Sequence, residues 1–451
     1  MSTEIKAIVL QTKSKYAKMY AGSGNAEDEI DIAWGNKDYQ YVTLAKAVFL
    51  NAKEAREFGG NMYNKYKDKA TELTIDIKTK YANDIRDGID SASYTFDKYK
   101  TSPKKAKLIK WVVIDAVGNG LYDSIKFARD LVSEPSNVLF PEEYAERITD
   151  TLTPLGVTVK VYSQRQLEKM GFNLLLSVGQ GSDRDSYVVV MEWNHGKGQP
   201  IALVGKGVCF DTGGISLKPS KGMGDMKYDM GGSAAVVGAM HSIASQKVKR
   251  NVVGIVGLVE NMPDGKAIKP GDVVTSLSGM TVENLNTDAE GRLVLGDLLH
   301  YVQQEYKPHT IVDLATLTGA IMVALGSEMA GLFTNSTSLA TDIVDAGQQA
   351  GEGFYRMPMG ENWNKMIDSD IADFQNIGGA YGGSTTAAEF LYRFVDKEVA
   401  WAHLDIAGMA WEDKGKPITP KGAVGFGVRT LFNLVNKLSH TDHKIDKDMQ
   451  Y

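Results

Sequence analysis

From about residue 157 onward, short apolar runs alternate with longer amphipathic stretches. The apolar runs have the length of strands, and the amphipathic stretches repeat with a helical period. Alternation of this kind is typical of a mostly parallel sheet covered by helices on both faces. The pattern predicts strands over Val157–Tyr162, Tyr187–Trp193, Ile201–Cys209, Val252–Val259, Thr310–Ala315 and Trp401–Ile406, and helices over Ser233–Ser245, Arg292–Glu305, Ser338–Ala350, Thr385–Val395 and Gly425–Leu438.

Residues 1 to about 105 follow a different pattern. Short apolar runs such as Ala7–Leu10 and Tyr41–Leu50 alternate there with charged, helical-looking segments rich in lysine, aspartate and tyrosine. Residues Ile109–Leu131 then repeat with a helical period, and the two prolines of SEPSNVLFP follow. We therefore predict a separate N-terminal part over 1–105, a connecting helix over 106–131, and a larger α/β part over 132–451.

Composition and charge limit the class of protein. Of 451 residues, 43% are hydrophobic and 24% are charged, which excludes a disordered, collagen-like or fibrous chain. The formal net charge of −6 argues against nucleic acid or an anionic membrane as the main partner. A lysine run nevertheless stands out, and it is either a solvated face or a phosphate-binding patch. Its members are Lys98, Lys100, Lys104, Lys105, Lys107 and Lys110.

Targeting features are also informative. The single cysteine, Cys209, cannot form an internal disulfide, which fits a reducing compartment. The N-terminal segment has no apolar core of signal-peptide length, and no run of 18 apolar residues occurs. We therefore expect a cytoplasmic protein that does not enter a membrane.

Several familiar catalytic motifs are missing. The chain has no P-loop, no His-Glu-x-x-His and no Gly-x-Ser-x-Gly, and Phe210 stands where a dinucleotide fingerprint needs its third glycine. The seven histidines are scattered. These absences argue against a metal site built on histidine or cysteine, so any metal would be held by carboxylates.

Two Gly-rich segments concentrate charged residues among apolar ones. Residues 204–232 follow a predicted strand, and residues 284–297 precede a predicted helix. Asp288 and Glu290 are two residues apart, so in an extended segment both side chains point to one side. Two like charges aimed at one point are costly unless a cation lies between them. With Asp211 and Asp229, they form a four-carboxylate set large enough for two divalent ions. Taken singly, each of these residues is more often a turn or capping residue.

The octapeptide NTDAEGRL, residues 286–293, is the signature of the leucyl (cytosol) aminopeptidase family. The chain resembles that family over roughly residues 94–438. Further matching blocks stand in the same order: YTFDKYK, ARDLVSEPSN, SVGQGS, VGKGVCFDTGGISLK, MKYDMGGSAAV, VDLATLTGA, GGSTTAAEFL, WAHLDIAGMAW and KGAVGFGVRTL. The resemblance implies a small α/β N-terminal domain over 1–105, the connecting helix, and a catalytic domain over 132–451.

The resemblance also implies two divalent ions, Zn²⁺ or Mn²⁺. The tighter ion would be held by Lys206, Asp211, Asp229 and Glu290, and the exchangeable ion by Asp211, Asp288 and Glu290. Lys218 would be the catalytic electrophile, and Arg292 would hold a bicarbonate ion as general base. The first side chain of a peptide substrate would lie against Met226, Thr316, Gly319, Ala407 and Ala410. Leucine, methionine and other apolar N-terminal residues would be preferred, and the assembly would be a homo-hexamer, a dimer of trimers.

Three rival functions stay open at this point. An aminopeptidase of this family could also or mainly bind DNA, although the net charge argues against it. The chain could be an inactive homologue, although the candidate catalytic set is complete. It could also be a different two-metal hydrolase, such as a phosphatase.

Overall fold

In the computed structural model, the described residues are 6–11, 30–32, 41–45, 49–108, 110–118, 120–438 and 443–446. The chain forms two compact units. The first contains residues 1–122 together with 412–422, and the second contains 123–411 together with 423–451. Among the described residues, no helix combines the length and apolar character that crossing a membrane requires.

The first unit is built on a five-stranded sheet with the order β2-β3-β1-β4-β5. Its helices α2 and α3 pack closely through two glycines: a Cβ on Gly59 would lie 2.0 Å from the Ile85 carbonyl oxygen, and one on Gly88 would lie 1.9 Å from that of Arg56. The elements are β1 (Lys6–Gln11), β2 (Ile30–Ile32), β3 (Tyr41–Ala45), α2 (Ala52–Tyr66), β4 (Glu72–Asp76), α3 (Ala82–Ser93) and β5 (Lys110–Val113).

The helix predicted over 109–131 is wrong in its first half. Residues Lys110–Val113 form strand β5, which pairs in parallel with β4, and helix α4 (Leu121–Ser133) begins eight residues later. Gly118 and Gly120 have positive φ values of 72° and 68°, which interrupt a right-handed helix. The helical period of the sequence therefore spans a strand, a turn and a helix.

The second unit contains an eight-stranded sheet with the order β14-β13-β16-β12-β8-β9-β7-β6. The four central strands β16, β12, β8 and β9 are parallel, whereas β7, β6 and β13 run antiparallel to their inner neighbours. The bounds are β6 (Thr158–Ser163), β7 (Tyr187–Asn194), β8 (Ile201–Asp211), β9 (Asn251–Asn261), β12 (Thr310–Ala315), β13 (Ala330–Thr334), β14 (Phe354–Arg356) and β16 (Ala400–Asp405). All six predicted strands are therefore confirmed.

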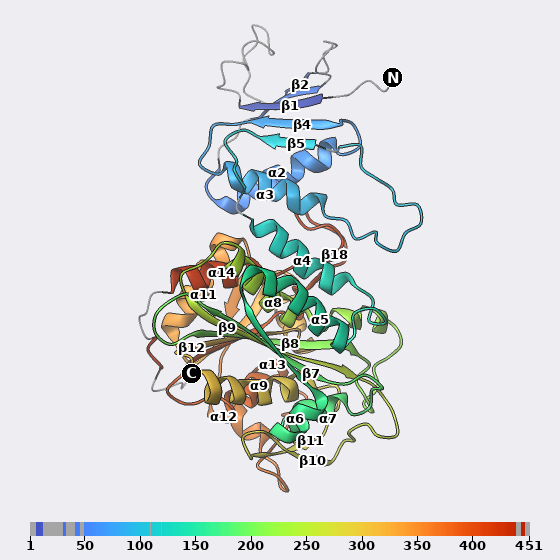
Figure 1. The fold of residues 1–451 in the computed structure, drawn as a ribbon, viewed down its shortest axis with the longest axis vertical. Coiled ribbons are helices and arrows are strands. Elements are labelled where there is room, and N and C mark those ends of the chain that lie inside the picture. The colour runs from blue at the N-terminus through green and yellow to red at the C-terminus, as the bar shows by residue number, and fades with distance from the viewer. Residues whose placement is uncertain are drawn as a thin grey trace. The chain divides into compact units, whose positions relative to one another are not determined.

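Helices cover both faces of this sheet, with α8, α5 and α14 on one face and α9, α13 and α7 on the other (Figure 1). The five predicted helices are confirmed with shifted ends; α14 starts three residues late, because Gly427 has a φ of 91°. The helices are α5 (Pro141–Leu152), α6 (Gln164–Met170), α7 (Asn173–Gly179), α8 (Gly231–Ser245), α9 (Gly291–Tyr306), α10 (Gly319–Leu325), α11 (Thr337–Ala350), α12 (Glu361–Asn364), α13 (Gly383–Tyr392) and α14 (Val428–Lys437), with 3₁₀ turns η1 (Thr153–Leu155), η2 (Met223–Tyr228) and η3 (Lys365–Ile367).

The remaining strands are short. β10, β11 and β15 form a three-stranded sheet, and β17 and β18 lie where the chain passes from one unit to the other. Their bounds are β10 (Asp272–Thr275), β11 (Thr281–Asn284), β15 (Phe374–Gln375), β17 (Trp411–Glu412) and β18 (Gly422–Ala423). The fold is thus an α/β structure whose central strands β8, β9, β12 and β16 all end at one edge, where the predicted chemistry is expected.

Candidate metal centre

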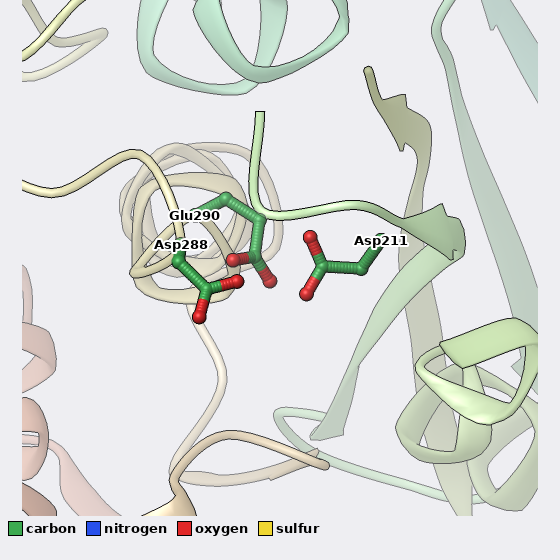
Figure 2. A group of neighbouring side chains, drawn as sticks. All are labelled: Asp211, Asp288 and Glu290. Carbon is green, nitrogen blue, oxygen red and sulfur yellow. The ribbon is translucent and has the colours of Figure 1, made fainter. Parts of the chain in front are cut away.

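Four carboxylates converge at the carboxyl end of β8. Asp211 is the last residue of β8, Asp229 lies between η2 and α8, and Asp288 and Glu290 immediately precede α9. Asp211, Asp288 and Glu290 each offer an oxygen, and these oxygens lie within 4.8 Å of one another. Figure 2 shows the three carboxylates pointing toward a common point. The structure therefore brings together acids that are up to 79 residues apart in the sequence.

Lys206 enters this cluster from the middle of β8, and its side chain is fully buried. Its Nζ lies 2.7 Å from Asp229 Oδ2 and 2.8 Å from Glu290 Oε1, and it donates to the carbonyl oxygen of Thr316 at 2.8 Å. Burial by itself lowers the pKa of Lys206, but the carboxylates of Asp229, Glu290 and Asp211 outweigh this and raise it. The positive charge of protonated Lys206 therefore offsets the negative charge of these carboxylates, as a bound metal ion would.

Lys218 makes a second set of ion pairs. It lies in the turn after β8, and its Nζ is 2.7 Å from Asp211 Oδ2 and also contacts Asp288 Oδ1. Burial lowers its pKa, and the charges of Asp211 and Glu290 more than compensate, so that the pKa is raised. Its side chain is 20% exposed, in contrast to 2% for Lys206. Lys218 is therefore a charged donor at the open side of the cluster.

The ionised form of three of these carboxyl groups is energetically unfavourable. Burial raises the pKa of Asp211, Asp229 and Asp288, and a neighbouring carboxylate adds to the rise in each case. Such a cluster favours the binding of cations, because a dication removes the repulsion that the two lysines only partly offset. Carboxylate oxygens and an amine are suitable donors for divalent ions, and bridging carboxylates allow two ions to share ligands. The donor set therefore fits two divalent ions.

Two residues that the sequence analysis missed hold these ligands in place. Asn261, the last residue of β9, donates to Asp211 Oδ1 at 2.9 Å and to the Thr287 carbonyl oxygen at 3.0 Å. The Thr287 hydroxyl donates to the Gly213 carbonyl oxygen at 2.6 Å. These bonds join the turn after β8 to the loop before α9. A polar residue ending an apolar strand was the available sequence signal for Asn261.

Arg292 lies in the first turn of α9 and is buried. Its Nη1 donates to the Asn376 carbonyl oxygen at 2.6 Å, and its buried Nε has no hydrogen-bond partner among the described residues. Burial lowers the pKa of Arg292 to about 10, and the charges of Glu290 and Asp405 limit the fall. The guanidinium thus stays charged at neutral pH with a donor available, an arrangement suited to a small planar anion.

Asn376 was also missed. Its Oδ1 accepts from the backbone N–H groups of Leu285 and Asn286, at 2.8 and 3.3 Å, and its Nδ2 donates to Asn284 Oδ1 at 2.8 Å. It therefore anchors both the loop that carries Asp288 and Glu290 and the side chain of Arg292. No sequence signal connects it to that loop, since they are about 90 residues apart.

The predicted substrate residues lie on several loops at the same edge. Thr316 follows β12, and its hydroxyl donates to Asp229 Oδ1 at 2.8 Å, which helps to orient that acid. A Cβ on Gly231 would lie 3.1 Å from Ala410 Cβ and 3.4 Å from Thr316 Cγ2, which brings these two residues to the start of α8. Met226 lies in η2, Gly319 begins α10, and Ala407 follows β16.

Known proteins resemble this chain over most of its length. Residues 126–432 match the model of the cytosol aminopeptidase family, catalytic domain. The chain is 47% identical over 416 residues to a "Probable cytosol aminopeptidase" of Xanthobacter autotrophicus, covering 87% of this chain and 83% of that protein. It is 48% identical over 439 residues to one of Ehrlichia ruminantium, covering 92% and 88%.

A solved structure agrees with these relatives. The bottromycin maturation enzyme BotP in complex with Mn superposes with a TM-score of 0.86 at 32% identity, covering 96% of this chain and 99% of that chain. The match to the family model spans more than half of the chain, and the relatives span most of it. The chain therefore belongs to the cytosol aminopeptidase family and is a metal-dependent aminopeptidase.

Proposed function

We propose that this aminopeptidase removes apolar N-terminal residues from peptides and amino-acyl amides, with two divalent ions in the cluster. Lys206, Asp211, Asp229 and Glu290 would hold the tighter ion, and Asp211, Asp288 and Glu290 the exchangeable one. The observation that carries this proposal is the approach of Asp211, Asp288 and Glu290 oxygens to within 4.8 Å beside the fully buried Lys206. The similar enzyme BotP was solved in complex with Mn, which supports Mn²⁺ or a comparable dication such as Zn²⁺.

The chain's own residues have separate tasks. Two dications held here would lower the pKa of a shared water molecule and polarise the scissile carbonyl group. Lys218, kept charged by Asp211 and Asp288, donates a hydrogen bond to the oxyanion that develops on that carbonyl. Lys206 must lose its proton to act as a ligand, so the two lysines work in opposite protonation states.

Arg292 would hold a bicarbonate ion that serves as general base. Its Nε, which has no hydrogen-bond partner among the described residues, and the amide groups at the start of α9 can both donate to such an anion. A base placed there accepts the proton of the attacking water and returns it to the leaving amine. Arg292 cannot ligate a cation itself, so its contribution is separable from metal binding.

Substrate selection would rest on residues around the cluster. Met226, Thr316, Gly319, Ala407 and Ala410 would line a pocket for the first side chain, and their mostly apolar character favours leucine or methionine over acidic residues. A free α-amine bound at the metal centre would restrict cleavage to the N-terminal residue. By the same resemblance we propose a cytoplasmic homo-hexamer, a dimer of trimers, with residues 132–451 as the catalytic domain.

The decisive experiment starts from metal-free protein. Zn²⁺, Mn²⁺, Mg²⁺ or Co²⁺ is added back, and turnover is measured on a panel of amino-acyl amides and on a phosphate ester. We expect no turnover without metal, restoration by Mn²⁺ or Zn²⁺, and fastest cleavage of Leu or Met amides. Turnover of the phosphate ester alone, or full activity without metal, would refute the proposal.

A variant pair tests the ligand assignment. Asp288→Asn removes a proposed ligand, and Asp225→Asn removes an exposed carboxylate of η2 from the same active-site segment. Replacement of groups that only support a ligand typically costs about 10–100-fold in metal affinity or activity, so loss of a ligand should cost at least that. Asp288→Asn should therefore lose metal and activity, and Asp225→Asn should retain both. Equal behaviour of the two variants would remove Asp288 from the ligand set.

A further inference from the structure

The N-terminal unit contains a pocket of about 560 Å³ whose lining includes no residue of the proposed catalytic machinery. Three segments line it: Tyr63 to Asp68 at the end of α2 and just beyond it, residues from Ala92 at the end of α3 to Ala106, and the hairpin between Lys414 and Lys421. All three belong to the same compact unit, because residues 412–422 are part of it.

The charge of this pocket is strongly one-sided. Asp68 is the only acid among its lining residues, against six lysines: Lys67, Lys104, Lys105, Lys414, Lys416 and Lys421. Lys67 donates to Asn64 Oδ1 at 3.1 Å, and Lys416 Nζ lies 3.6 Å from Glu412 Oε2. Within the described part of the chain, Lys416 is thus the only one of the six with a carboxylate partner. A chain with a net charge of −6 thus gathers mutually repelling ammonium groups around one hollow.

Two of the three lining segments, α2 and the hairpin, are packed directly against each other. Asn64 Nδ2 donates to the Pro417 carbonyl oxygen at 3.0 Å, and a Cβ on Gly60 would lie only 2.5 Å from that same oxygen. The hairpin is closed by backbone hydrogen bonds between Lys416 and Thr419, at 2.7 and 3.1 Å. Because the hairpin is held directly against α2, the lysines of the two segments face one hollow before any ligand arrives, which lowers the entropy cost of binding.

The chemistry of the lining selects the ligand. The volume lies in the range of small-molecule sites, about 300–1,000 Å³. Ammonium groups are compact point charges that suit phosphate oxygens, and several of them favour an anion with several charges. We propose that this pocket binds a small anion with two or more linked phosphates, either an inorganic oligophosphate or the phosphate chain of a nucleotide. Two of its lysines, Lys104 and Lys105, come from the sequence run in which a phosphate-binding patch was one of two interpretations.

The test is calorimetric titration of the metal-loaded full chain with inorganic tripolyphosphate, ATP or adenosine. The pocket variant is Lys105→Gln with Lys414→Gln. The matched control is Lys266→Gln with Lys397→Gln, two exposed lysines of the second unit, so both proteins lose two positive charges. Any phosphate compound that binds to the catalytic metals should do so equally in the pocket variant and in the control variant. The difference in affinity between the two variants therefore reports binding in the pocket.

We expect tripolyphosphate and ATP to bind the parent and the control, and adenosine not to bind. The pocket variant should bind at least about 10-fold more weakly, because it lacks two ammonium groups that can each form a charge-assisted hydrogen bond to a phosphate oxygen. Turnover of Leu amide without phosphate should be the same in all three proteins. ATP binding without tripolyphosphate binding, or equal affinities of the pocket and control variants, would overturn the proposal. The proposal would also be overturned if the parent protein bound duplex DNA but not tripolyphosphate, and if the pocket variant no longer bound the DNA. That result would indicate a nucleic-acid surface.

Discussion

Gly291 is the first residue of α9 and directly follows Glu290. A Cβ at this position would lie 2.6 Å from Lys206 Cε, 2.7 Å from Cδ and 2.8 Å from Nζ. Real Cβ atoms essentially never approach heavy atoms this closely, so Gly291→Ala requires the lysine to move. The substitution changes no charge and removes no candidate ligand. It therefore tests the position of Lys206 alone.

The size of the effect follows from these contacts. Ordinary contact begins at 3.4 Å, so Lys206 Cε must shift by about 0.8 Å from its 2.6 Å position. The lysine is fully buried, and its Nζ is held at 2.7–2.8 Å by Asp229, Glu290 and the Thr316 carbonyl oxygen, so the shift disrupts those contacts. Misplacement of a catalytic group by about 1 Å can cost ~10²-fold in rate. We expect a comparable loss in kcat/KM, with weaker retention of the tighter metal.

The fold should survive this substitution. Overpacking a buried site costs about 1–3 kcal/mol. Alanine in place of glycine returns up to about 1 kcal/mol of helix propensity. Thermal unfolding should therefore show a folded variant with a modestly lower midpoint, which separates misplacement of Lys206 from loss of the fold.

The assay is Leu-amide hydrolysis with defined Mn²⁺, together with metal content after gel filtration. Gly265→Ala is the matched control, because a Cβ there meets nothing within 4 Å. The control should behave as the parent does. Parent-like kcat/KM and metal content in Gly291→Ala would show that Lys206 does not act from its position beside Gly291.

Four further outcomes are expected. Arg292→Ala should keep its metal content and KM but lose about 10–10³-fold in kcat. Added bicarbonate should accelerate turnover by parent enzyme prepared without bicarbonate, but not turnover by the variant. Loss of metal in the variant would contradict this assignment. Because carboxylates raise the pKa of Lys206, the amine carries a proton that must leave when it binds a metal ion. Affinity for the tighter ion should therefore rise about tenfold per pH unit for each proton released, and calorimetry in two buffers measures that number of protons. An affinity that stays constant between pH 6 and 8 would refute amine ligation. N-acetylated peptides should be inert and Leu amides should exceed Asp amides in rate, whereas efficient cleavage of a blocked peptide would rule out amine binding at the metals. Light scattering should give about six times 49.2 kDa, and a fully active monomer would reject the hexamer.

Much of the catalytic unit could be predicted from local sequence. Its six predicted strands are short apolar runs with turn residues on either side, and buried parallel strands produce that pattern directly. Asp288 and Glu290 lie within a single short loop, so their spacing along the chain already indicates that they can act on one point. Sequence pattern failed at residues 109–131, where a helical period runs across strand β5 and a glycine turn, because side-chain periodicity does not report pairing with a distant strand.

Tertiary structure decided which of the distant groups meet. Lys206 contacts Asp229 and Glu290, and Asn376 contacts the loop before α9. These contacts depend on strand order and on close packing across the edge of the sheet. The lysine pocket likewise joins Lys104 and Lys105 to a hairpin about 310 residues later in the chain. The sequence alone determined the secondary structure of the large sheet and the residue types of its candidate metal centre, because these depend on neighbours along the chain. The partners of each charged group depend on neighbours in space, and those are set only when the whole chain has packed.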